Sequence, residues 1–328
     1  MAARILDNIA WYVDSAAKGK GEPGLYNTYM ASLATALDYV GDKVDPAWLM
    51  GTSAFAFRTL VNEVMCPSAM SVFSWEPILP ETVEQASRCC IYIGDVSGDR
   101  ATREEKTAKA HQEIRKAIDR GVPPIVWDLQ IPEWGLIIGY DDGTRNYSTL
   151  TGHEEIGTTP FDSLGQKNVK LLSVAILGEP NSRSREQIIL SSLRTAVRHA
   201  EQKEWQDRPK YIDGPAAYDL WASIIEPGKN DKTNFGFAKY YAGHYFAARA
   251  YARDYLSQIA DGNETLLKAA SACGRAASFL KPAWHRFSAE EKPSDDVLAS
   301  LAQSIRKAKT AEQQGLASIK EYLKGAAS

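Results

Sequence analysis

The sequence predicts an α+β domain with an antiparallel sheet over residues 1–180, followed by an all-α helical domain over residues 181–328. Short apolar runs rich in β-forming residues occur only in the first part. After Gly178-Glu179-Pro180-Asn181 nearly all spacing is helical. A length of 328 residues also exceeds what a single core usually organises, so two domains are expected.

The N-terminal part begins with residues 3–17, which fit either a short helix or an edge strand. Residues 19–24 form a loop, Leu25 to Val40 has helical spacing that stops at Gly41, and residues 46–50 form a second short helix. A charged helix is expected over 101–120. Strands are expected at 53–60, 70–75, 90–94, 124–129, 134–140, 147–151 and 170–177. The short turn at 130–133 predicts an antiparallel hairpin.

The C-terminal part reads as a succession of helices. They are expected at 184–205, 214–226, 234–260, 263–280 and 290–325. Proline or glycine punctuates this part at Pro209, Pro227-Gly228, Gly262 and Pro282, and each is expected to end a helix.

Composition excludes several classes of protein. Hydrophobic residues are 44% and charged residues 24%, as in an ordinary globular protein, and the net charge of -3 is too small to favour nucleic acid or an anionic membrane. No apolar run is long enough for a bilayer, and Asp7 and Asp14 interrupt any signal-peptide pattern. The four cysteines match no zinc-ligand spacing. We therefore expect a cytoplasmic protein with free thiols and no metal or cofactor.

The entry to the first long helix is the first candidate for chemistry. Asn27 and Thr28 lie at the positive end of its dipole, where a nucleophile or a bound anion is favoured. The alternative is an ordinary N-cap, because asparagine and threonine are both common there.

The expected hairpin is the second candidate. Trp127, Asp128, Glu133 and Trp134 lie within eight residues, so a partly desolvated carboxylate could act as a base or pair with an ammonium group beside aromatic faces. The alternative is a solvated turn whose tryptophans serve the core. Asp141, before Asp142-Gly143, is either a turn residue or an orienting carboxylate.

Three further parts of the sequence are candidates for chemistry. Arg58 could clamp an anionic ligand or form an ion pair within the chain. Cys66 could be a nucleophile or a small buried hydrophobe. Tyr241, His244 and Tyr245 share one helix face, which could line a cleft or belong to a hydrogen-bonded core.

Several segments together resemble the butirosin biosynthesis protein H-like family, which is similar to papain-like folds and to double-glycine bacteriocin-processing peptidases. The run from Tyr26 to Ala34, with Tyr39-Val40-Gly41, resembles the family's first helix. Met50-Gly51 to Arg58 resembles its glycine-and-phenylalanine segment, and Glu133 to Asp141 resembles the strand that carries its histidine. The resemblance covers nearly the whole chain.

This resemblance implies a papain-like site in which a cysteine is acylated and passes the acyl group to an amine. The nucleophile position falls at Thr28, with Asn27 as the register alternative, and the base position falls at Glu133. Asp141 lies where an orienting acid would be sought. The family's cysteine and histidine are therefore both replaced, and a helix dipole worth roughly 1 kcal/mol does not turn a threonine into a strong nucleophile.

The leading hypothesis is a pseudoenzyme of specialised metabolism that binds an amine-bearing or cationic small molecule in a cleft between the domains. The alternative is an acyltransferase or amide hydrolase acting on a small amine metabolite. A small-molecule ligand is the expected partner, nucleic acid and membrane are not, and a homodimer stays open. The expected ligand-binding residues are Tyr26, Asn27, Arg58, Trp127, Asp128, Trp134, His244 and Tyr245.

Overall fold

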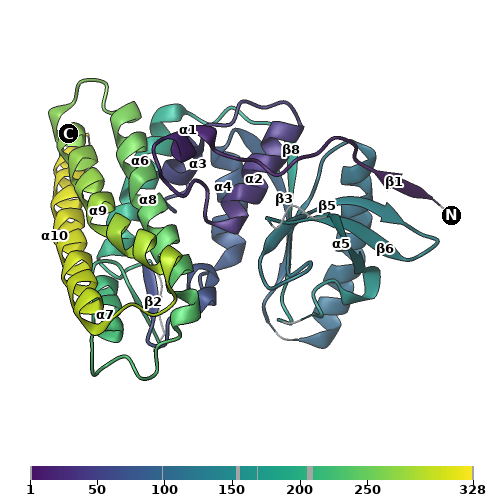
Figure 1. Ribbon diagram of the computed structural model, residues 1–328. Helices are drawn as coiled ribbons and strands as arrows, with labels where there is room; N and C mark the ends of the chain where they lie inside the picture. Colours follow the sequence, from purple (N-terminus) through teal and green to yellow (C-terminus); the bar gives the residue numbers. More distant parts are fainter. Residues whose placement is uncertain (1, 98, 153–155, 168, 205–209, 327–328) are drawn as a thin grey trace. The chain divides into compact units, whose positions relative to one another are not determined.

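A computed structural model describes residues 2–97, 99–152, 156–167, 169–204 and 210–326 of the chain (Figure 1). Contacts divide it into two compact units. Unit 1 comprises 1–14, 27–45 and 74–183, and unit 2 comprises 15–26, 46–73 and 184–328. The second unit therefore draws two short segments from the first half of the sequence. No described helix is both long enough and apolar enough to cross a membrane.

Unit 1 is built on a mixed α/β plan with an antiparallel sheet, as the sequence predicts. Its strands are β1 (Ala3–Ile5), β3 (Arg88–Asp95), β4 (Ile125–Trp127), β5 (Trp134–Asp141), β6 (Asn146–Leu150), β7 (Ile156–Pro160) and β8 (Leu172–Pro180). They pair in the order β3-β8-β4-β5-β6-β7, and β1 pairs with the far end of β5. The predicted hairpin of β4 and β5 is confirmed. Residues 3–17 were predicted to form either a short helix or an edge strand, and the structure has a strand at Ala3–Ile5.

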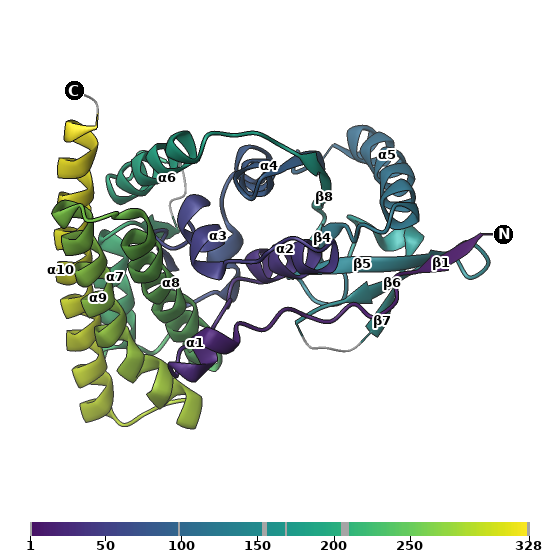
Figure 2. The same ribbon diagram turned by 90° about the horizontal axis from the view of Figure 1, so that it is seen from above.

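Three helices of unit 1 cover opposite faces of this sheet. They are α2 (Thr28–Tyr39), α4 (Trp75–Gln85) and α5 (Arg100–Asp119). Trp134 on β5 contacts the α2 and α4 side, whereas Ile137 belongs to the apolar cluster that packs against α5. Side chains alternate between faces along a strand, so these two positions mark opposite faces. Figure 2 accordingly shows α4 and α5 on either side of β8.

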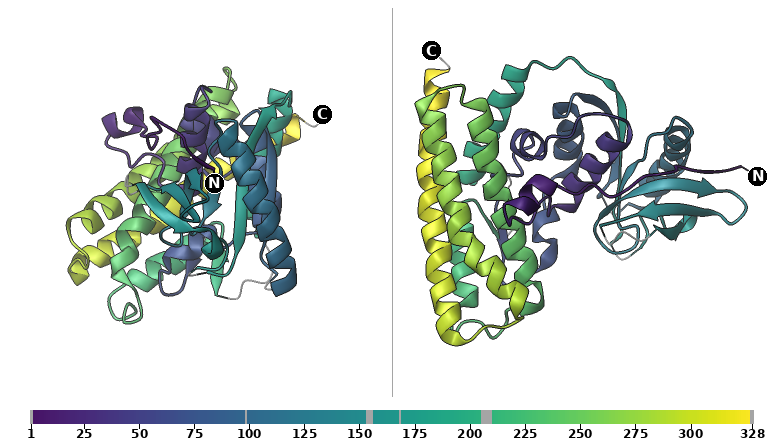
Figure 3. Two further views of the ribbon diagram at one scale, coloured as in Figure 1. Left: turned by 90° about the vertical axis from the view of Figure 1, so that its right-hand side faces the viewer. Right: turned by 45° about the horizontal axis from the view of Figure 1, so that its top comes forward.

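Unit 2 is mainly helical, which confirms the expectation for the C-terminal part. Its helices are α1 (Ser15–Gly19), α3 (Pro46–Thr52), α6 (Arg185–Ala200), α7 (Ala216–Ile225), α8 (Ala238–Ile259), α9 (Glu264–Ala289) and α10 (Asp295–Gly325). A two-stranded ladder joins β2 (Leu60–Asn62) to β9 (Tyr211–Asp213). Figure 3 shows α8, α9 and α10 packed lengthwise against one another, and their small alanine-rich faces form one core cluster.

Two predicted strands, 53–60 and 70–75, are wrong. In 53–60 the backbone turns through Ala54 (φ 60), and the carbonyls of Ala56 and Arg58 accept hydrogen bonds from the Arg249 guanidinium. This backbone is thus satisfied by a helix side chain rather than by a strand. Only Leu60 of the predicted run enters β2. In place of the second strand, a 3₁₀ helix forms at Pro67–Ser71 and α4 starts at Trp75.

The expected helix end at Pro282 is also wrong, because α9 continues through this proline to Ala289. Proline removes one backbone hydrogen bond, but α9 lies between α8 and α10 over most of its length. Tertiary packing of an amphipathic helix outweighs one lost bond.

Candidate functional site

The start of α2 lies beside the start of β5, both in unit 1. Asn27 is the N-cap of α2, since its side-chain Oδ1 accepts a hydrogen bond from the Met30 amide at 3.1 Å. The next residue, Thr28, accepts a hydrogen bond at Oγ1 from the backbone amide of Trp134 at 3.3 Å. The capping alternative for Asn27 is therefore confirmed, and Thr28 lies at the end of the strand that Glu133 precedes.

Four aromatic rings gather at the same end of the sheet. Trp75, Trp127 and Trp134 are separated pairwise by 5.0–5.1 Å between ring centroids, and Tyr29 meets Trp134 edge-on at 5.0 Å. All four are buried, and the Tyr29 hydroxyl donates to the carbonyl of Leu79 at 2.8 Å. These rings thus form a packed aromatic wall beneath the start of α2.

The β4–β5 turn is closed by its own backbone. The Asp128 amide donates to the Glu133 carbonyl at 2.9 Å, and Asp128 adopts a left-handed conformation with φ of 58°. Its buried carboxylate accepts from the amide of Val169 at 3.0 Å. Asp128 therefore shapes the turn, and Glu133, the last residue before β5, is half-buried.

Asp141 is not brought to this site. It ends β5, seven residues beyond Trp134, which at about 3.3 Å per residue places it roughly 23 Å away. Its carboxylate accepts from the Gly143 amide at 2.7 Å and from Thr144, and these hydrogen bonds lower its pKa. Asp141 therefore stabilises the β5–β6 turn, which agrees with the alternative prediction that it is a turn residue.

The other predicted ligand residues, Tyr26, Arg58, His244 and Tyr245, belong to unit 2. Arg58 forms a buried ion pair with Glu204, with Nη2 2.6 Å from Oε1. Glu204 also contacts Nδ1 of His199 at 3.0 Å, and the pKa of the Glu204 carboxyl falls to about 2 although burial alone would raise it, because of the Arg58 charge. The ion-pair alternative for Arg58 is thus confirmed.

Tyr245 and Tyr241 use their hydroxyls to hold the segment around β2. Tyr245 donates to the Leu60 carbonyl and accepts from the Leu60 amide, and Tyr241 donates to the carbonyl of Cys66 at 2.8 Å. These hydrogen bonds confirm the alternative prediction for this helix face, namely that it belongs to a hydrogen-bonded core. Cys66 itself lies 2.9 Å from the hydroxyl of Ser68.

Tyr26 packs on α8 next to His244. Its ring is 5.6 Å from that of Tyr240 and lies over Gly243, where an added Cβ would come within 2.9 Å of it. His244 is buried, and its Nδ1 has no hydrogen-bond partner among the described residues. Burial, with the nearby Arg249 charge, lowers the pKa of His244 to about 3.

The neutral His244 predicts acid sensitivity of unit 2. Its folded-state pKa of about 3 lies below the ordinary value of 6.5, so the unfolded chain takes up a proton first as the pH falls. Stability is therefore complete above about pH 6.5 and declines toward pH 3 by at most about 1.4 kcal/mol per pH unit. Urea unfolding of wild type and His244→Phe at several pH values measures this. Equal slopes in both proteins would contradict the prediction.

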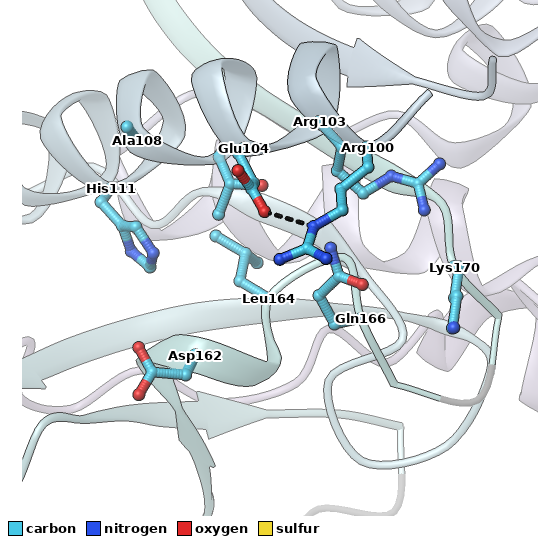
Figure 4. A pocket seen from close by; sticks show the side chains of 10 residues that line it. Arg100, Arg103, Glu104, Ala108, His111, Asp162, Leu164, Gln166 and Lys170 are labelled. Carbon is cyan, nitrogen blue, oxygen red and sulfur yellow. Dashed lines mark hydrogen bonds and ion pairs between the residues drawn. The ribbon is translucent and has the colours of Figure 1, made fainter. Parts of the chain in front are cut away.

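A group of polar side chains on α5 is not among the site residues predicted from the sequence. Arg100, Arg103, Thr107 and His111 recur at intervals of three or four residues, so they share one face of the helix. They line a pocket of unit 1 together with Lys170 (Figure 4). The helical period of these residues was the available signal, but no local pattern indicates that this face opens onto a cavity.

Neither comparison with known sequences identifies a relative: the chain matches no protein-family model and no curated protein. Among the described residues, no group of three or more histidine, cysteine, aspartate or glutamate side chains could hold a metal ion.

Proposed function

We propose that this chain is a small-molecule-binding protein on a papain-like scaffold of the butirosin H-like kind, with the catalytic pair of that family replaced. The proposed ligand carries an amine or another cationic group, and its binding site lies at the start of α2. The hydrogen bond from the Trp134 amide to Thr28 Oγ1 is the observation that supports this most directly, because it joins Thr28 to the residue that directly follows Glu133 in the chain.

The chemistry of these residues favours binding over acyl transfer. A threonine hydroxyl needs a strong general base, and glutamate, with an ordinary pKa of about 4.3, is a weak one. The Thr28 oxygen also already accepts a backbone hydrogen bond. The Glu133 carboxylate, in contrast, suits an ammonium group, because the two groups attract each other by charge.

Calorimetry with a panel of small primary amines tests the proposal. Wild type is expected to bind at least one amine, and Glu133→Gln is expected to bind it about tenfold more weakly, since a charge-assisted hydrogen bond is lost. Asp141→Asn is the matched control: it removes the same charge from the other end of β5 and should leave the affinity within about twofold.

Two outcomes would contradict this assignment. Equal affinity of wild type and Glu133→Gln removes Glu133 from the site, and loss of affinity in Asp141→Asn alone moves the site to the other end of the strand. Incubation with acyl thioesters followed by intact-mass measurement addresses the alternative activity. An acyl adduct that disappears in Thr28→Val would favour the acyltransferase or amide hydrolase.

A further inference from the structure

The sheet of unit 1 ends at β3, and one edge of this strand is open. In the order β3-β8-β4-β5-β6-β7, β3 pairs with β8 and with no second strand among the described residues. The other main neighbours of β3 in the described chain are α4 and α5, which cover opposite faces of the sheet rather than its edge. The free edge of β3 is therefore a place where a further strand can add to the sheet.

The hydrogen bonds of the inner strands show which backbone groups of β3 face this edge. Pro124, directly before Ile125 of β4, accepts a hydrogen bond from β5, so the backbone groups of Ile125 face β8. Ile125 is paired with Ala175 of β8, so the two neighbours of Ala175 face the other way, toward β3. One of these neighbours is paired with Ile91, whose backbone groups therefore face β8.

Because this direction alternates along a strand, every second residue of β3 presents its N–H and C=O groups at the open edge. One printed side chain reaches these groups: Lys106 of α5 donates from Nζ to the Gly94 carbonyl at 2.6 Å. The described part of the chain supplies no other hydrogen bond to them. The outward-facing residues are Arg88, Cys90, Tyr92 and Gly94.

The two edges of the sheet differ in how well they are protected against pairing with another strand. At the far edge, β7 has only five residues and ends at Pro160, which has no N–H group. β3 has eight residues and no proline, and residues 89–94 carry no charged side chain. A strand of this length without charge or proline at its centre is a good template for another strand.

The outward-facing residues are arranged symmetrically about Ile91. If a second copy of β3 lies antiparallel with a two-fold axis at Ile91, Arg88 lies opposite Gly94 and Cys90 lies opposite Tyr92. All four residues then exchange backbone hydrogen bonds with the other copy. The Gly94 carbonyl can keep its bond from α5, because a carbonyl oxygen has two lone pairs.

The side chains are compatible with the same register. Ile91 would meet its counterpart on the axis, and Cys89 would lie opposite Ile93, so the central pairs are uncharged. Arg88 is already neutralised within its own chain, because its Nη2 lies 2.7 Å from Oδ1 of Asp42. No like charges therefore come to lie opposite each other, and the strand offers no charge that would select a charged peptide instead.

We propose that the chain forms a two-fold symmetric dimer in which the β3 strands of two copies pair antiparallel about Ile91. The two sheets then continue into one another across the axis. A second copy is the occupant that the symmetry of the outward-facing residues and the uncharged centre of the strand favour. This interface is separate from the amine site proposed above, and neither depends on the other.

The oligomeric state of the full chain is the first test. Analytical ultracentrifugation over a range of protein concentrations should show the mass of two chains, with dissociation on dilution. A mass of one chain at every concentration would overturn the proposal, and would leave the edge free for a strand of another protein.

Two substitutions at one position test the backbone hydrogen bonds. Tyr92→Ala removes the ring but keeps the outward-facing N–H group, whereas Tyr92→Pro removes both. Tyr92→Pro should therefore weaken dimerisation at least tenfold relative to Tyr92→Ala, because two hydrogen bonds are lost per dimer. Thr158→Pro makes the same change at the far edge and should dimerise like wild type. Equal dimerisation of Tyr92→Pro and Tyr92→Ala would refute the assignment.

A cross-link tests the register without depending on a weakened dimer. In a Cys89→Ser background, Ile91→Cys should form an intermolecular disulfide under mild oxidation, because directly opposed residues of an antiparallel pair have Cβ atoms about 5 Å apart. Val96→Cys is the control: it is more exposed, at 62%, but lies five residues from the axis. A dimer in which Ile91→Cys cross-links no faster than Val96→Cys has its interface elsewhere, and that result would also overturn the proposal.

Discussion

Replacing Arg249 by methionine is expected to destabilise unit 2 by about 3–5 kcal/mol. Arg249 on α8 is almost fully buried and binds Glu312 of α10 through two hydrogen bonds, Nε to Oε2 at 2.5 Å and Nη2 to Oε1 at 3.0 Å. Its Nη1 also donates to the carbonyls of Ala56 and Arg58. The substitution leaves the Glu312 carboxylate buried without its counter-charge, which is the costly part of the change.

Arg253→Met is the matched control for this prediction. Arg253 lies one turn further along α8, is 30% exposed and pairs with Glu22 and Asp254. A half-buried ion pair that solvent still reaches contributes less than a fully buried one, so its loss should cost about 1 kcal/mol. Urea unfolding followed by far-UV circular dichroism measures both variants.

The double variant Arg249→Met with Glu312→Leu separates the cost of the unpaired Glu312 charge from the cost of the hydrogen bonds lost by the carbonyls of residues 56 and 58. It leaves no uncompensated charge, so it should recover part of the lost stability, while the carbonyls of residues 56 and 58 remain without their donor. A loss below about 1 kcal/mol in Arg249→Met alone would contradict the burial of this ion pair.

Gly51→Ala is expected to cost about 3 kcal/mol or more, because the new methyl group has no room. A Cβ on Gly51 of α3 would lie 2.0 Å from Cγ of Tyr255, a ring atom close to the α8 backbone. The ring cannot easily move away. It packs edge-on against Trp48 and Phe57, and its hydroxyl lies 2.8 Å from that of Ser192.

Gly19→Ala is the control for this overpacking. Gly19 ends the short helix α1, and a Cβ there would meet nothing within 4 Å. The melting temperature of Gly19→Ala should stay close to that of wild type, whereas the melting temperature of Gly51→Ala should fall by several degrees. Similar melting temperatures for the two variants would mean that α3 and α8 do not approach as closely as described.

Local patterns were sufficient for several elements of the fold. The apolar helical spacing from Leu25 predicted the start of α2 within three residues, and the apolar strands flanking residues 130–133 predicted the β4–β5 hairpin. These features depend on neighbours in the sequence: a cap satisfies amides three residues away, and a short turn joins adjacent strands. Thr28 and Glu133 were paired as site residues by the family resemblance, and local patterns alone do not relate two positions so far apart in the sequence.

The tertiary structure decided what depends on distant partners. Residues 53–60 have strand-like composition, but their carbonyls are satisfied by Arg249 from a helix nearly two hundred positions later. Pro282 lies inside α9 because neighbouring helices support it, and the α5 side chains line a pocket together with Asp162, Leu164, Gln166 and Lys170. A sequence specifies which groups need partners, whereas only the folded chain determines which distant groups supply them.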